Sequence, residues 1–539
     1  METILKLIQE GNYQEAFPLI SKEKEINGNS DVLAILEATA WQELNNREAM
    51  WQAISQGLIC NPQNYELYYM LGDYYYPVNG QQAWLCYENA KFYCSQEEDY
   101  KLIQARMEEL EEQISPPGKV AIVILSYNSL EMTKNCIMSI RENCIRESYE
   151  LIVIDNNSQD GSVEWLKEQQ GIKLLCNKEN QGFPKGCNQG MQMAEPESDI
   201  LLLNNDTLMM PNSLFWLRMG LYESTEVGAC GSVSNSTANY QKIPETYDTV
   251  GGYFDYALKH NVPEKYPYEE RMYLIGFAML IKREAVNKVG MLDEQFTPGN
   301  FEDTDYGVRL IKAGYRNRVC KNSFIFHWGG QSFGKKQERY VTLIQKNKKI
   351  FEEKWKRKFQ EFSSIRTDII NKMDRPEGQK PMQVLDLECG YGMTLAKIQS
   401  EYPNAKCYGV AKEQEKAEIA ARYATVVQGD LEAITLEKEW GMFDYIIAGE
   451  ILETLKEPEK LLRKIRNLLK EQGSLLTSVS DMQSWSEKSL RELMEHAGYQ
   501  VDGVWYYKTP GEKIEICQIL MRVRKNNQDT EEGLDGTIS

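Results

Sequence analysis

The sequence predicts a multidomain protein in which an α-helical repeat segment precedes two α/β domains. Residues 1–115 place apolar side chains three and four positions apart, which is typical of helices. Residues 119–126 and 149–155 are runs of β-branched and aliphatic side chains on either side of a helical stretch, as in a parallel sheet. A further strand followed by a glycine-bearing turn begins near residue 384. With 539 residues, 42% of them hydrophobic, the chain has enough material for several cores.

The first segment shows internal repetition and a strong acidic bias. It carries 19 acidic and 7 basic side chains, a net charge of −12. Small alanines recur at intervals of 33 and 34 residues, at Ala16, Ala49 and Ala83. This spacing resembles the tetratricopeptide repeat, in which pairs of helices stack and bury a continuous core. Tyrosines such as Tyr74 and Tyr75 either line a groove for an extended polypeptide or pack between helices and in a dimer contact.

Composition excludes several classes of protein. A net charge of −19 disfavours general nucleic-acid binding, which depends on a positive surface. The 12 cysteines contain no Cys-x-x-Cys pair, so neither a disulfide framework nor a zinc site is expected. The N-terminus lacks a basic and apolar leader, and no apolar run is long enough to span a membrane. A cytoplasmic protein without a membrane span is therefore expected.

The middle of the chain, residues 119–345, carries motifs at the ends of its expected strands. They resemble glycosyltransferase family 2, with its GT-A fold, in both order and spacing, and the likeness extends over residues 119–360. The segments that carry it are 123–128, 153–162, 180–188, 203–207, 290–296 and 301–305. The resemblance implies a nucleoside diphosphate sugar as the donor substrate.

Several residues are expected to hold the nucleotide sugar. Asp155 ends a parallel strand, where a carboxylate accepts a hydrogen bond from a base such as uracil, and Tyr127 is placed to stack on the ring. The resemblance adds Asn180, Asn204 and Asn205 to this group. A nearby carboxylate, Asp160, is expected to cap the helix that begins after Gly161, and Gly182 and Gly186 are expected to let backbone approach the nucleotide.

A divalent cation is expected beside the donor diphosphate. Asp206 ends the segment that replaces the family's Asp-X-Asp motif, and its carboxylate suits Mn²⁺ or Mg²⁺. His327, one of three histidines in the chain, lies 24 residues after Asp303, where the family often places a second ligand. The alternatives are ordinary turn chemistry for Asp206 and a structural role for the histidine.

The resemblance places the catalytic base at Asp303. Inverting transfer needs a carboxylate that removes the acceptor proton. The helix beginning here turns Asp305 away by about 200°, so Asp305 is expected to support the site from behind. Glu302 and Trp328 are expected to orient the acceptor. The alternative is an acidic helix N-terminus favoured by the helix dipole.

Residues 346–379 read as a charged helical linker, and a third domain is expected over 380–525, followed by a disordered acidic tail at 526–539. The third domain resembles class I S-adenosylmethionine-dependent methyltransferases. The positions that would form the cofactor loop and its surroundings are Asp386, Gly390, Gly392 and Asp430.

The third domain departs from that family at three positions. Glu388 stands where the loop normally has its first glycine, Ala411 replaces the carboxylate that holds the ribose, and Thr454 replaces a common histidine. Loss of the ribose acceptor removes hydrogen bonds worth roughly 1.5–3 kcal/mol each. S-adenosylmethionine binding and methyltransferase activity are therefore expected to be absent. A scaffold for homodimerisation or acceptor docking is expected instead.

Together these features predict an inverting, metal-dependent glycosyltransferase that acts on a protein. The appended repeat suggests a polypeptide acceptor, and the resemblance suggests Ser/Thr hydroxyls of a bacterial surface protein such as flagellin, with N-acetylglucosamine from UDP-GlcNAc. The alternatives are a polysaccharide or rhamnan glycosyltransferase, a bifunctional glycosyltransferase and methyltransferase, and a non-catalytic assembly protein.

Overall fold

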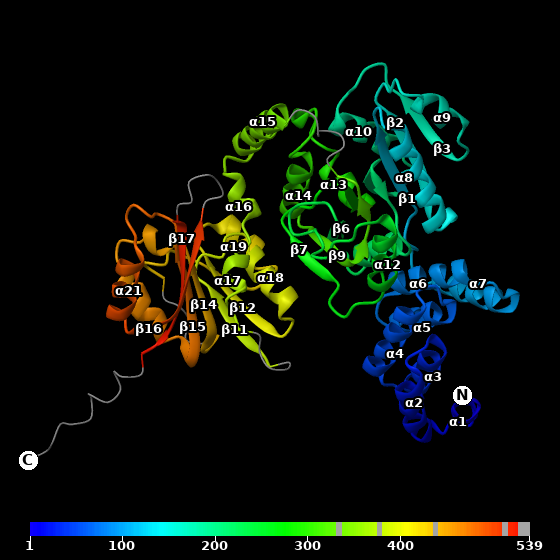
Figure 1. The fold of residues 1–539 in the computed structure, drawn as a ribbon, viewed down its shortest axis with the longest axis horizontal. Helices are drawn as coiled ribbons and strands as arrows, with labels where there is room; N and C mark the ends of the chain where they lie inside the picture. Colours follow the sequence, from blue (N-terminus) through cyan, green and yellow to red (C-terminus); the bar gives the residue numbers. More distant parts are fainter. Residues whose placement is uncertain (330–336, 375–379, 435–439, 509–515, 527–539) are drawn as a thin grey trace, which may run out of the picture. The chain divides into compact units, whose positions relative to one another are not determined.

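A computed structural model of the chain describes residues 1–329, 337–374, 380–434, 440–508 and 516–526 (Figure 1). The chain divides into two compact units, Met1–Arg357 and Lys358–Ser539. The boundary falls inside the expected linker, residues 346–379, so that segment is shared between the two units. The expected acidic tail lies outside the described residues from position 527 onward.

The first unit begins with paired helices, and after the first helix the starting points of every second helix recur at intervals of 32 to 34 residues. Stacking of such pairs matches the repeat pattern loosely, because α1 is shorter than the others. The helices are α1 Glu2–Gln9, α2 Tyr13–Asn27, α3 Asp31–Glu43, α4 Arg47–Cys60, α5 Tyr65–Tyr75, α6 Gly80–Tyr93 and α7 Glu97–Glu111.

Side-chain caps fix where these helices begin. Asn46, Asn64 and Asn79 each accept a hydrogen bond from the backbone N–H three residues later, at distances of 3.0–3.1 Å. This bond satisfies one of the free donors of a helix N-terminus. The helices α4, α5 and α6 therefore each begin after an asparagine cap.

An α/β layer structure follows the helices. Its eight-stranded sheet, within the described residues, has the order β3-β2-β1-β4-β8-β6-β9-β7, and β1 is parallel to both β2 and β4. The strands are β1 Val120–Ser126, β2 Tyr149–Asp155, β3 Ile172–Cys176, β4 Asp199–Asn204, β6 Val227–Val233, β7 Tyr268–Arg271, β8 Ala278–Ile281 and β9 Arg316–Phe324.

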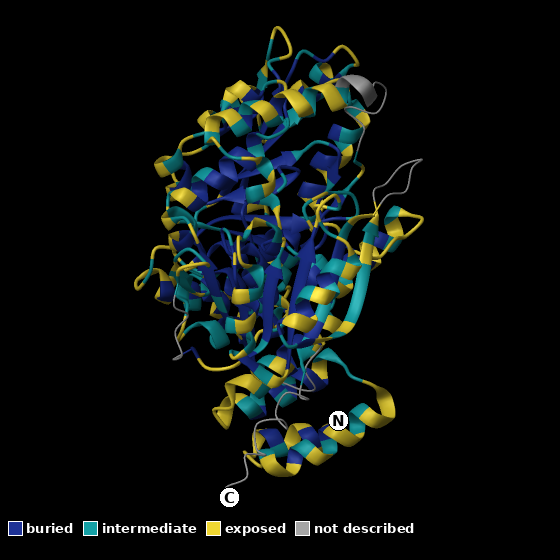
Figure 2. Cartoon of the chain, turned by 90° about the vertical axis from the view of Figure 1, so that its left-hand side faces the viewer, coloured by how far each residue is buried: buried dark blue, intermediate teal, exposed yellow. Residues whose placement is uncertain are grey.

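Alternate residues of β1 face two different cores, as the two-residue period of a strand requires. Ile122 and Ile124 belong to the core that is continuous with the helical repeat, and Val123 belongs to the opposite core, which includes residues of α10 and α14. Figure 2 shows most strands coloured as buried and the exposed colour mainly on helices and loops. The helices are α8 Leu130–Asn143, α9 Ser162–Glu168, α10 Phe183–Met193, α11 Ser213–Leu221, α12 Val250–His260, α13 Arg283–Val289, α14 Glu302–Lys312 and α15 Gln337–Trp355, with the 3-10 turns η1 Arg146–Ser148 and η2 Glu294–Phe296.

Two glycines of α10 have a packing role that the sequence did not indicate. A Cβ at Gly186 would lie 2.4 Å from Leu125, and one at Gly190 would lie 2.3 Å from Val123. Both glycines face β1, one helical turn apart, so they allow α10 to lie directly on the strand. Gly186 therefore allows α10 to pack closely on β1. The sequence had suggested instead that this glycine lets the backbone approach the nucleotide.

The helical repeat is docked on the sheet domain through α6 and α11. Gln82 donates to the carbonyl of Met219 at 2.9 Å, and Tyr93 donates to Asn212 at 2.9 Å. Arg218 of α11 and Glu88 of α6 form a buried ion pair. Burial raises the pKa of Glu88, and the Arg218 guanidinium opposes that rise. The repeat and the sheet domain thus share one core.

We expect Arg218→Ala to destabilise the first unit by about 3–5 kcal/mol, because it leaves the Glu88 carboxylate buried without its partner. The folded-state pKa of Glu88 is already raised, and loss of the cation raises it further. The destabilisation should therefore grow as the pH rises through that pKa and be smallest in acid. Urea denaturation at several pH values measures this, with Lys101→Ala at an exposed ion pair as the control. Equal effects of the two substitutions would contradict it.

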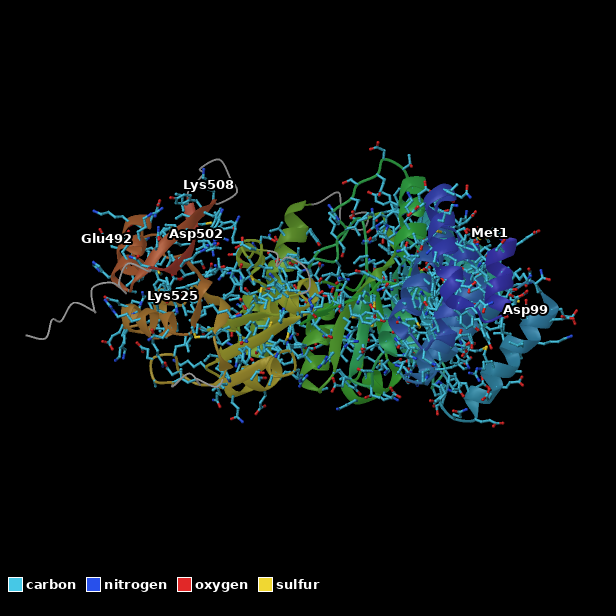
Figure 3. The ribbon with its side chains drawn as sticks, turned by 90° about the horizontal axis from the view of Figure 1, so that it is seen from below. Met1, Asp99, Glu492, Asp502, Lys508 and Lys525 are labelled. Atoms are coloured by element: carbon cyan, nitrogen blue, oxygen red, sulfur yellow. The ribbon has the colours of Figure 1, made fainter. Side chains whose placement is uncertain are left out.

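The second unit contains, within its described residues, a seven-stranded sheet of order β13-β12-β11-β14-β15-β17-β16, with β17 antiparallel to its neighbours. Asp502, labelled in Figure 3, pairs with Arg522 and Arg524 across β16 and β17. The strands are β11 Met382–Asp386, β12 Ala405–Ala411, β13 Thr425–Gln428, β14 Phe443–Gly449, β15 Leu469–Val479, β16 Tyr499–Lys508 and β17 Ile516–Lys525. The helices are α16 Phe359–Ser363, α17 Thr367–Ile370, α18 Met393–Glu401, α19 Gln414–Ala420, α20 Pro458–Arg466 and α21 Glu487–His496, with the 3-10 turn η4 Leu452–Thr454.

The predicted fold class is confirmed: a helical segment precedes one α/β domain and a second, Rossmann-like one. All 12 cysteines are free thiols. None of the helices in the described part of the chain has the length and apolarity needed to cross a membrane.

Candidate functional site

A short two-stranded ribbon brings Asp206 and His327 together at one edge of the sheet. Strands β5 Thr207–Leu208 and β10 Phe326–His327 pair antiparallel, with His327 opposite Thr207. The Nε2 atom of His327 lies 3.1 Å from Oδ1 of Asp206. The two residues are 121 positions apart in sequence, so this pairing is produced by the fold.

The surroundings of His327 fix its ring and its tautomer. Nδ1 lies 2.6 Å from the carbonyl oxygen of Ser236, and the ring stacks on Phe277 with centroids 5.2 Å apart. A carbonyl oxygen only accepts hydrogen bonds, so Nδ1 carries the proton. In the protonated ring Nε2–H donates to the carboxylate of Asp206, and in the neutral ring the lone pair of Nε2 is available to a cation beside that carboxylate.

This donor set fits a divalent cation. An imidazole nitrogen and a carboxylate oxygen are suitable ligands for Mn²⁺, and a backbone carbonyl orients the histidine, as is usual for metal-binding histidines. No group of three or more His, Cys, Asp or Glu side chains that could hold a metal occurs among the described residues. Asp206 and His327 would therefore supply two ligands, and the remaining positions would fall to the donor diphosphate and water.

Asp303, the predicted base, is held at the first turn of α14. Its Oδ2 accepts a hydrogen bond from the N–H of Gly276 at 3.0 Å, and its Oδ1 accepts one from the N–H of Thr304 at 2.7 Å. Burial raises the pKa of Asp303, and these two N–H groups oppose the rise. A carboxylate with a raised pKa accepts a proton more readily, which suits a general base.

Gly276 and Phe277 join the predicted base to the predicted metal ligands. Gly276 donates to Asp303, while the next residue, Phe277, stacks on His327 and accepts a hydrogen bond from the N–H of Asn204 at 2.9 Å. Consecutive Cα atoms are about 3.8 Å apart. The fold therefore brings Asp303, Asp206 and His327 to one region, although they come from three separate parts of the sequence.

The other two acids of this helix differ from Asp303. Glu302 is 6% exposed, and its Oε2 has no hydrogen-bond partner among the described residues. Burial raises its pKa well above the usual value, and the charge of Asp303 adds to this. Asp305 is fully buried and pairs with Arg309 at 2.8 Å and Lys354 at 2.6 Å. Asp305 therefore forms ion pairs with Arg309 and Lys354, and the pair with Lys354 fastens α14 to α15.

Asp155 and Tyr127 lie at the ends of β2 and β1. Oδ1 of Asp155 accepts a hydrogen bond from the N–H of Ser158 at 2.9 Å. Its Oδ2 is buried without a hydrogen-bond partner among the described residues. Tyr127 follows β1 and is 48% exposed. An unused carboxylate oxygen beside an exposed aromatic ring is a suitable acceptor for a base N–H.

The predicted asparagines have different environments. Asn180 is exposed and accepts hydrogen bonds from Asn156 and Gly182. Asn204 lies at the end of β4, half-buried. Asn205 donates to Thr133 of α8 at 3.0 Å, so its amide group points into the protein.

Two further predicted residues have partners within the first unit. Asp160 accepts hydrogen bonds from Ser162 at the start of α9 and from Leu130 at the start of α8, so it caps two helices. Trp328 is 39% exposed, packs edge-on against Phe326 and donates its backbone N–H to the carbonyl of Asp206 at 2.9 Å. The backbone of Trp328 is thus hydrogen-bonded to that of Asp206, beside the two predicted metal ligands Asp206 and His327.

Sequence reasoning missed the residues that support these side chains. Asn235 donates to the carbonyl of His327 and accepts from its N–H, at 3.1 and 2.9 Å, and Ser236 holds the ring. Gly276 donates to Asp303, and Phe277 stacks on His327. None of these four lies in a motif, and their partners are at least 27 residues away in sequence, apart from backbone neighbours. Only the folded chain reveals them.

In the second unit, the glycine-bearing turn follows β11 as predicted. Asp386 is buried and accepts a hydrogen bond from the N–H of Glu388 at 3.2 Å, and burial raises its pKa to about 7. A Cβ at Gly390 would meet nothing within 4 Å, so the turn has open space on that side. Gly392 has a φ of +84° and is the N-cap residue before α18. Glu388 is exposed, so its side chain does not fill the turn.

Two positions around this turn differ from what S-adenosylmethionine would be expected to use there. Ala411 ends β12, where a ribose would need a carboxylate. Asp430 accepts hydrogen bonds on both oxygens, from the N–H of Glu432 at 3.0 Å and from Lys412 at 2.8 Å. A ligand that needs this carboxylate would have to compete with Lys412, whose ion pair with Asp430 is exposed. Among the predicted cofactor positions, the space beside Gly390 in the turn is free of protein atoms.

A segment of the same unit crosses this edge of the sheet. The ring of Phe362 stacks on Tyr391 in the turn, with centroids 5.2 Å apart. The backbone N–H of Arg366 donates to Thr394, and its guanidinium donates to Ser478 at the end of β15 at 2.7 Å. A Cβ at Gly449 would lie 2.3 Å from that guanidinium. Residues 359–373 thus contact the ends of β11, β14 and β15.

Each of the two α/β domains contains a segment that matches a known family model. Residues 121–290 match the family model "Glycosyl transferase family 2", and residues 379–528 match "Methyltransferase domain". The chain contains one domain of each kind. The helical segment and the supporting helix α15 lie outside the matched ranges.

Individual relatives are distant. The uncharacterized glycosyltransferase YfnE of Bacillus subtilis is 26% identical over 254 residues, covering 39% of this chain and 64% of YfnE. Malonyl-[acyl-carrier protein] O-methyltransferase of Halalkalibacterium halodurans is 26% identical over 117 residues, covering 20% and 43%. The chain thus spans less than two thirds of these relatives' lengths.

A solved structure of GalNAc-T7 with UDP, GalNAc and Mn²⁺ is also similar in part. It is 17% identical, with a TM-score of 0.33, and the alignment covers 43% of this chain and 48% of that one. A score of this size does not establish equivalent positions, so no residue role follows from it.

Proposed function

We propose that the first unit transfers a sugar from a nucleoside diphosphate donor to an acceptor hydroxyl with inversion. One observation carries the proposal: Gly276 and Phe277 tie the Asp303 carboxylate to the Asp206–His327 pair. Inverting transfer requires a base and a site for the leaving diphosphate close together. The match of residues 121–290 to glycosyltransferase family 2 supports the same chemistry.

Each side chain has a distinct task in this reaction. Asp155 accepts a hydrogen bond from the base of the donor, and Tyr127 stacks on that base. Asp206 and His327 would hold Mn²⁺ or Mg²⁺, which when bound neutralises charge on the leaving diphosphate. Asp303 removes the proton from the acceptor hydroxyl as its oxygen attacks the anomeric carbon. The N–H of Gly276 holds Oδ2 of Asp303 in place.

We propose UDP-N-acetylglucosamine as donor and Ser/Thr hydroxyls of a protein such as flagellin as acceptor. The docked helical repeat supports a polypeptide acceptor, because repeat surfaces commonly bind extended partners. The tyrosines of α5 pack between helices and against the sheet domain, so they do not add to this support. Homodimerisation and a cytoplasmic location remain predictions.

The proposed function is tested by incubating the whole chain with a panel of nucleoside diphosphate sugars and Mn²⁺. Release of nucleoside diphosphate is expected with one or a few donors and should increase when flagellin is added. Greater stimulation by oligosaccharides would favour the polysaccharide or rhamnan alternative. No release with any donor would contradict sugar transfer.

We expect Asp155→Asn to weaken UDP binding roughly 10- to 100-fold, because a hydrogen bond to a charged acceptor contributes about 1.5–3 kcal/mol. The amide nitrogen that replaces Oδ2 presents a donor where the base needs an acceptor. Isothermal titration with UDP measures the change, and Asp255→Asn at an exposed site on α12 is the control. Unchanged UDP affinity would remove Asp155 from the donor site.

For the second unit, we propose a methyltransferase fold without methyl transfer. Ala411, the occupied carboxylate of Asp430 and the segment at Arg366 support this. S-adenosylmethionine titrated into the protein should give no saturable heat up to about 1 mM, which corresponds to a binding free energy weaker than about −4 kcal/mol. A parallel titration of Ala411→Asp tests the ribose position. Saturable binding to the unaltered protein would instead favour the bifunctional alternative.

A further inference from the structure

The loop before Asp303 has a strained backbone. Asn300 and Phe301 are consecutive and have φ values of 76° and 75°. Side chains other than glycine rarely adopt this conformation, and for a bulky residue such as phenylalanine it is strained. It persists only where surrounding contacts hold it. Because Asp303 follows two residues later, the groups that hold this loop also set the position of its carboxylate.

Asn347 of α15 supplies such contacts with a single amide group. Its Nδ2 lies 2.8 Å from the carbonyl oxygen of Phe296, 2.9 Å from that of Gly299 and 3.0 Å from that of Asn300. The side chain is fully buried. Carbonyl oxygens only accept hydrogen bonds, so the amide nitrogen must face the loop.

Two other residues on the same face of α15 also contact this loop. Tyr340, seven residues before Asn347, donates to Oδ1 of Asn300 at 3.3 Å. Phe351, four residues after Asn347, is fully buried, and its ring lies 5.7 Å from that of Phe301. These spacings place the three side chains on one helical face, toward the loop.

The contacts of the next turn act on a different part of α14. Trp355 and Lys354 bind the carboxylate of Asp305, at 3.1 and 2.6 Å. Those contacts fasten the body of α14, whereas Asn347 binds the backbone that enters it. The two sets of contacts are therefore separable by mutation.

We infer that Asn347 is a positioning residue for the base: it holds residues 296–301 so that Asp303 keeps its hydrogen bond with Gly276. The catalytic part of this inference rests on the proposed function. A base displaced by about 1 Å loses on the order of 100-fold in rate. Asp155, Asp206 and His327 lie on other elements, and residues 296–301 meet the donor region through the hydrogen bond from the N–H of Phe183 to the carbonyl of Pro298 at 2.8 Å. We therefore expect donor binding to change little.

Two measurements on the whole chain test the inference, with Asn347→Ala, Asn347→Ser and Lys349→Ala. A serine is shorter and can serve at most one carbonyl, so it provides a milder change should the alanine variant not fold. Lys349 lies on the exposed face of the same helix and is the matched control. Hydrogen–deuterium exchange without ligand should show faster exchange over residues 294–305 in both Asn347 variants and no change in Lys349→Ala.

The second measurement is steady-state diphosphate release with the donor that the unaltered protein uses. We expect kcat to fall about 10- to 100-fold in the Asn347 variants, with KM for the donor within about twofold. Unchanged exchange over residues 294–305, or a loss confined to KM, would overturn the inference. Should the unaltered protein release no diphosphate, the proposed function fails, and the exchange result alone decides whether Asn347 holds the loop.

Discussion

Asp303→Asn should abolish sugar transfer, with a fall in kcat of about 10²- to 10⁴-fold, the usual contribution of a general base. The amide has nearly the same shape, and its oxygen can still accept the N–H of Gly276. It cannot accept the acceptor's proton. Diphosphate release in the presence of acceptor measures the loss, and Asp255→Asn is the control. Turnover within a few-fold of the unaltered protein would exclude Asp303 as the base.

The pH dependence of the unaltered enzyme adds to this test. The pKa of Asp303 is raised by burial, and the base acts in its deprotonated form. Activity should therefore fall, as the pH is lowered, at a higher pH than an exposed aspartate would give.

The pH dependence of the protein's folding stability also tests the raised pKa of Asp303. A raised folded-state pKa means that Asp303 contributes stability below its unfolded pKa and loses it as the pH rises through the folded value. The neutral Asp303→Asn variant should accordingly lose less stability than the unaltered protein as the pH rises, apart from a constant cost because its amide NH2 faces the N–H of Thr304. A strongly destabilised variant would point to a structural role for the carboxylate.

Removal of either predicted metal ligand should have an effect of similar size. We expect Asp206→Ala and His327→Ala each to lower activity about 100-fold or more, because a cation at the leaving group contributes several kcal/mol. The Mn²⁺ concentration for half-maximal activity should rise in both variants. Chelation of the unaltered protein should remove activity, and added Mn²⁺ should restore it.

His260 provides the matched control for this prediction. On α12 it stacks on Tyr256 with centroids 3.8 Å apart, and its Nδ1–H donates a hydrogen bond to the carbonyl oxygen of that residue at 2.8 Å. His260→Gln should leave the Mn²⁺ dependence unchanged. Equal Mn²⁺ dependence in His327→Ala and the unaltered protein would exclude His327 as a ligand.

Much of the fold could be predicted because its signals are local. The buried runs that became β1 and β2 read as strands, and the polar residues at their ends, such as Asp155, fall where parallel strands place a site. The pairing of Asp206 with His327 was expected only from family resemblance. It depends on β5 and β10, each two residues long, which carry no periodic signal of their own.

The supporting residues could not be predicted because their contacts are distant in sequence. Asn347 lies in a charged stretch that reads as a linker, yet α15 packs against the loop before the base. The spacing of Tyr340, Asn347 and Phe351 on one face was the available signal. The left-handed conformation of Phe301 had none, because nothing local favours it.

The most direct measurement is a crystal structure of the protein with UDP and Mn²⁺, using the anomalous scattering of manganese to locate the ion. The account predicts one ion bound by Oδ1 or Oδ2 of Asp206 and Nε2 of His327, at about 2.0–2.3 Å, with the diphosphate as a further ligand and Asp303 facing the same cleft. An ion bound elsewhere beside the bound nucleotide, or Asp303 in an unconnected region, would contradict it.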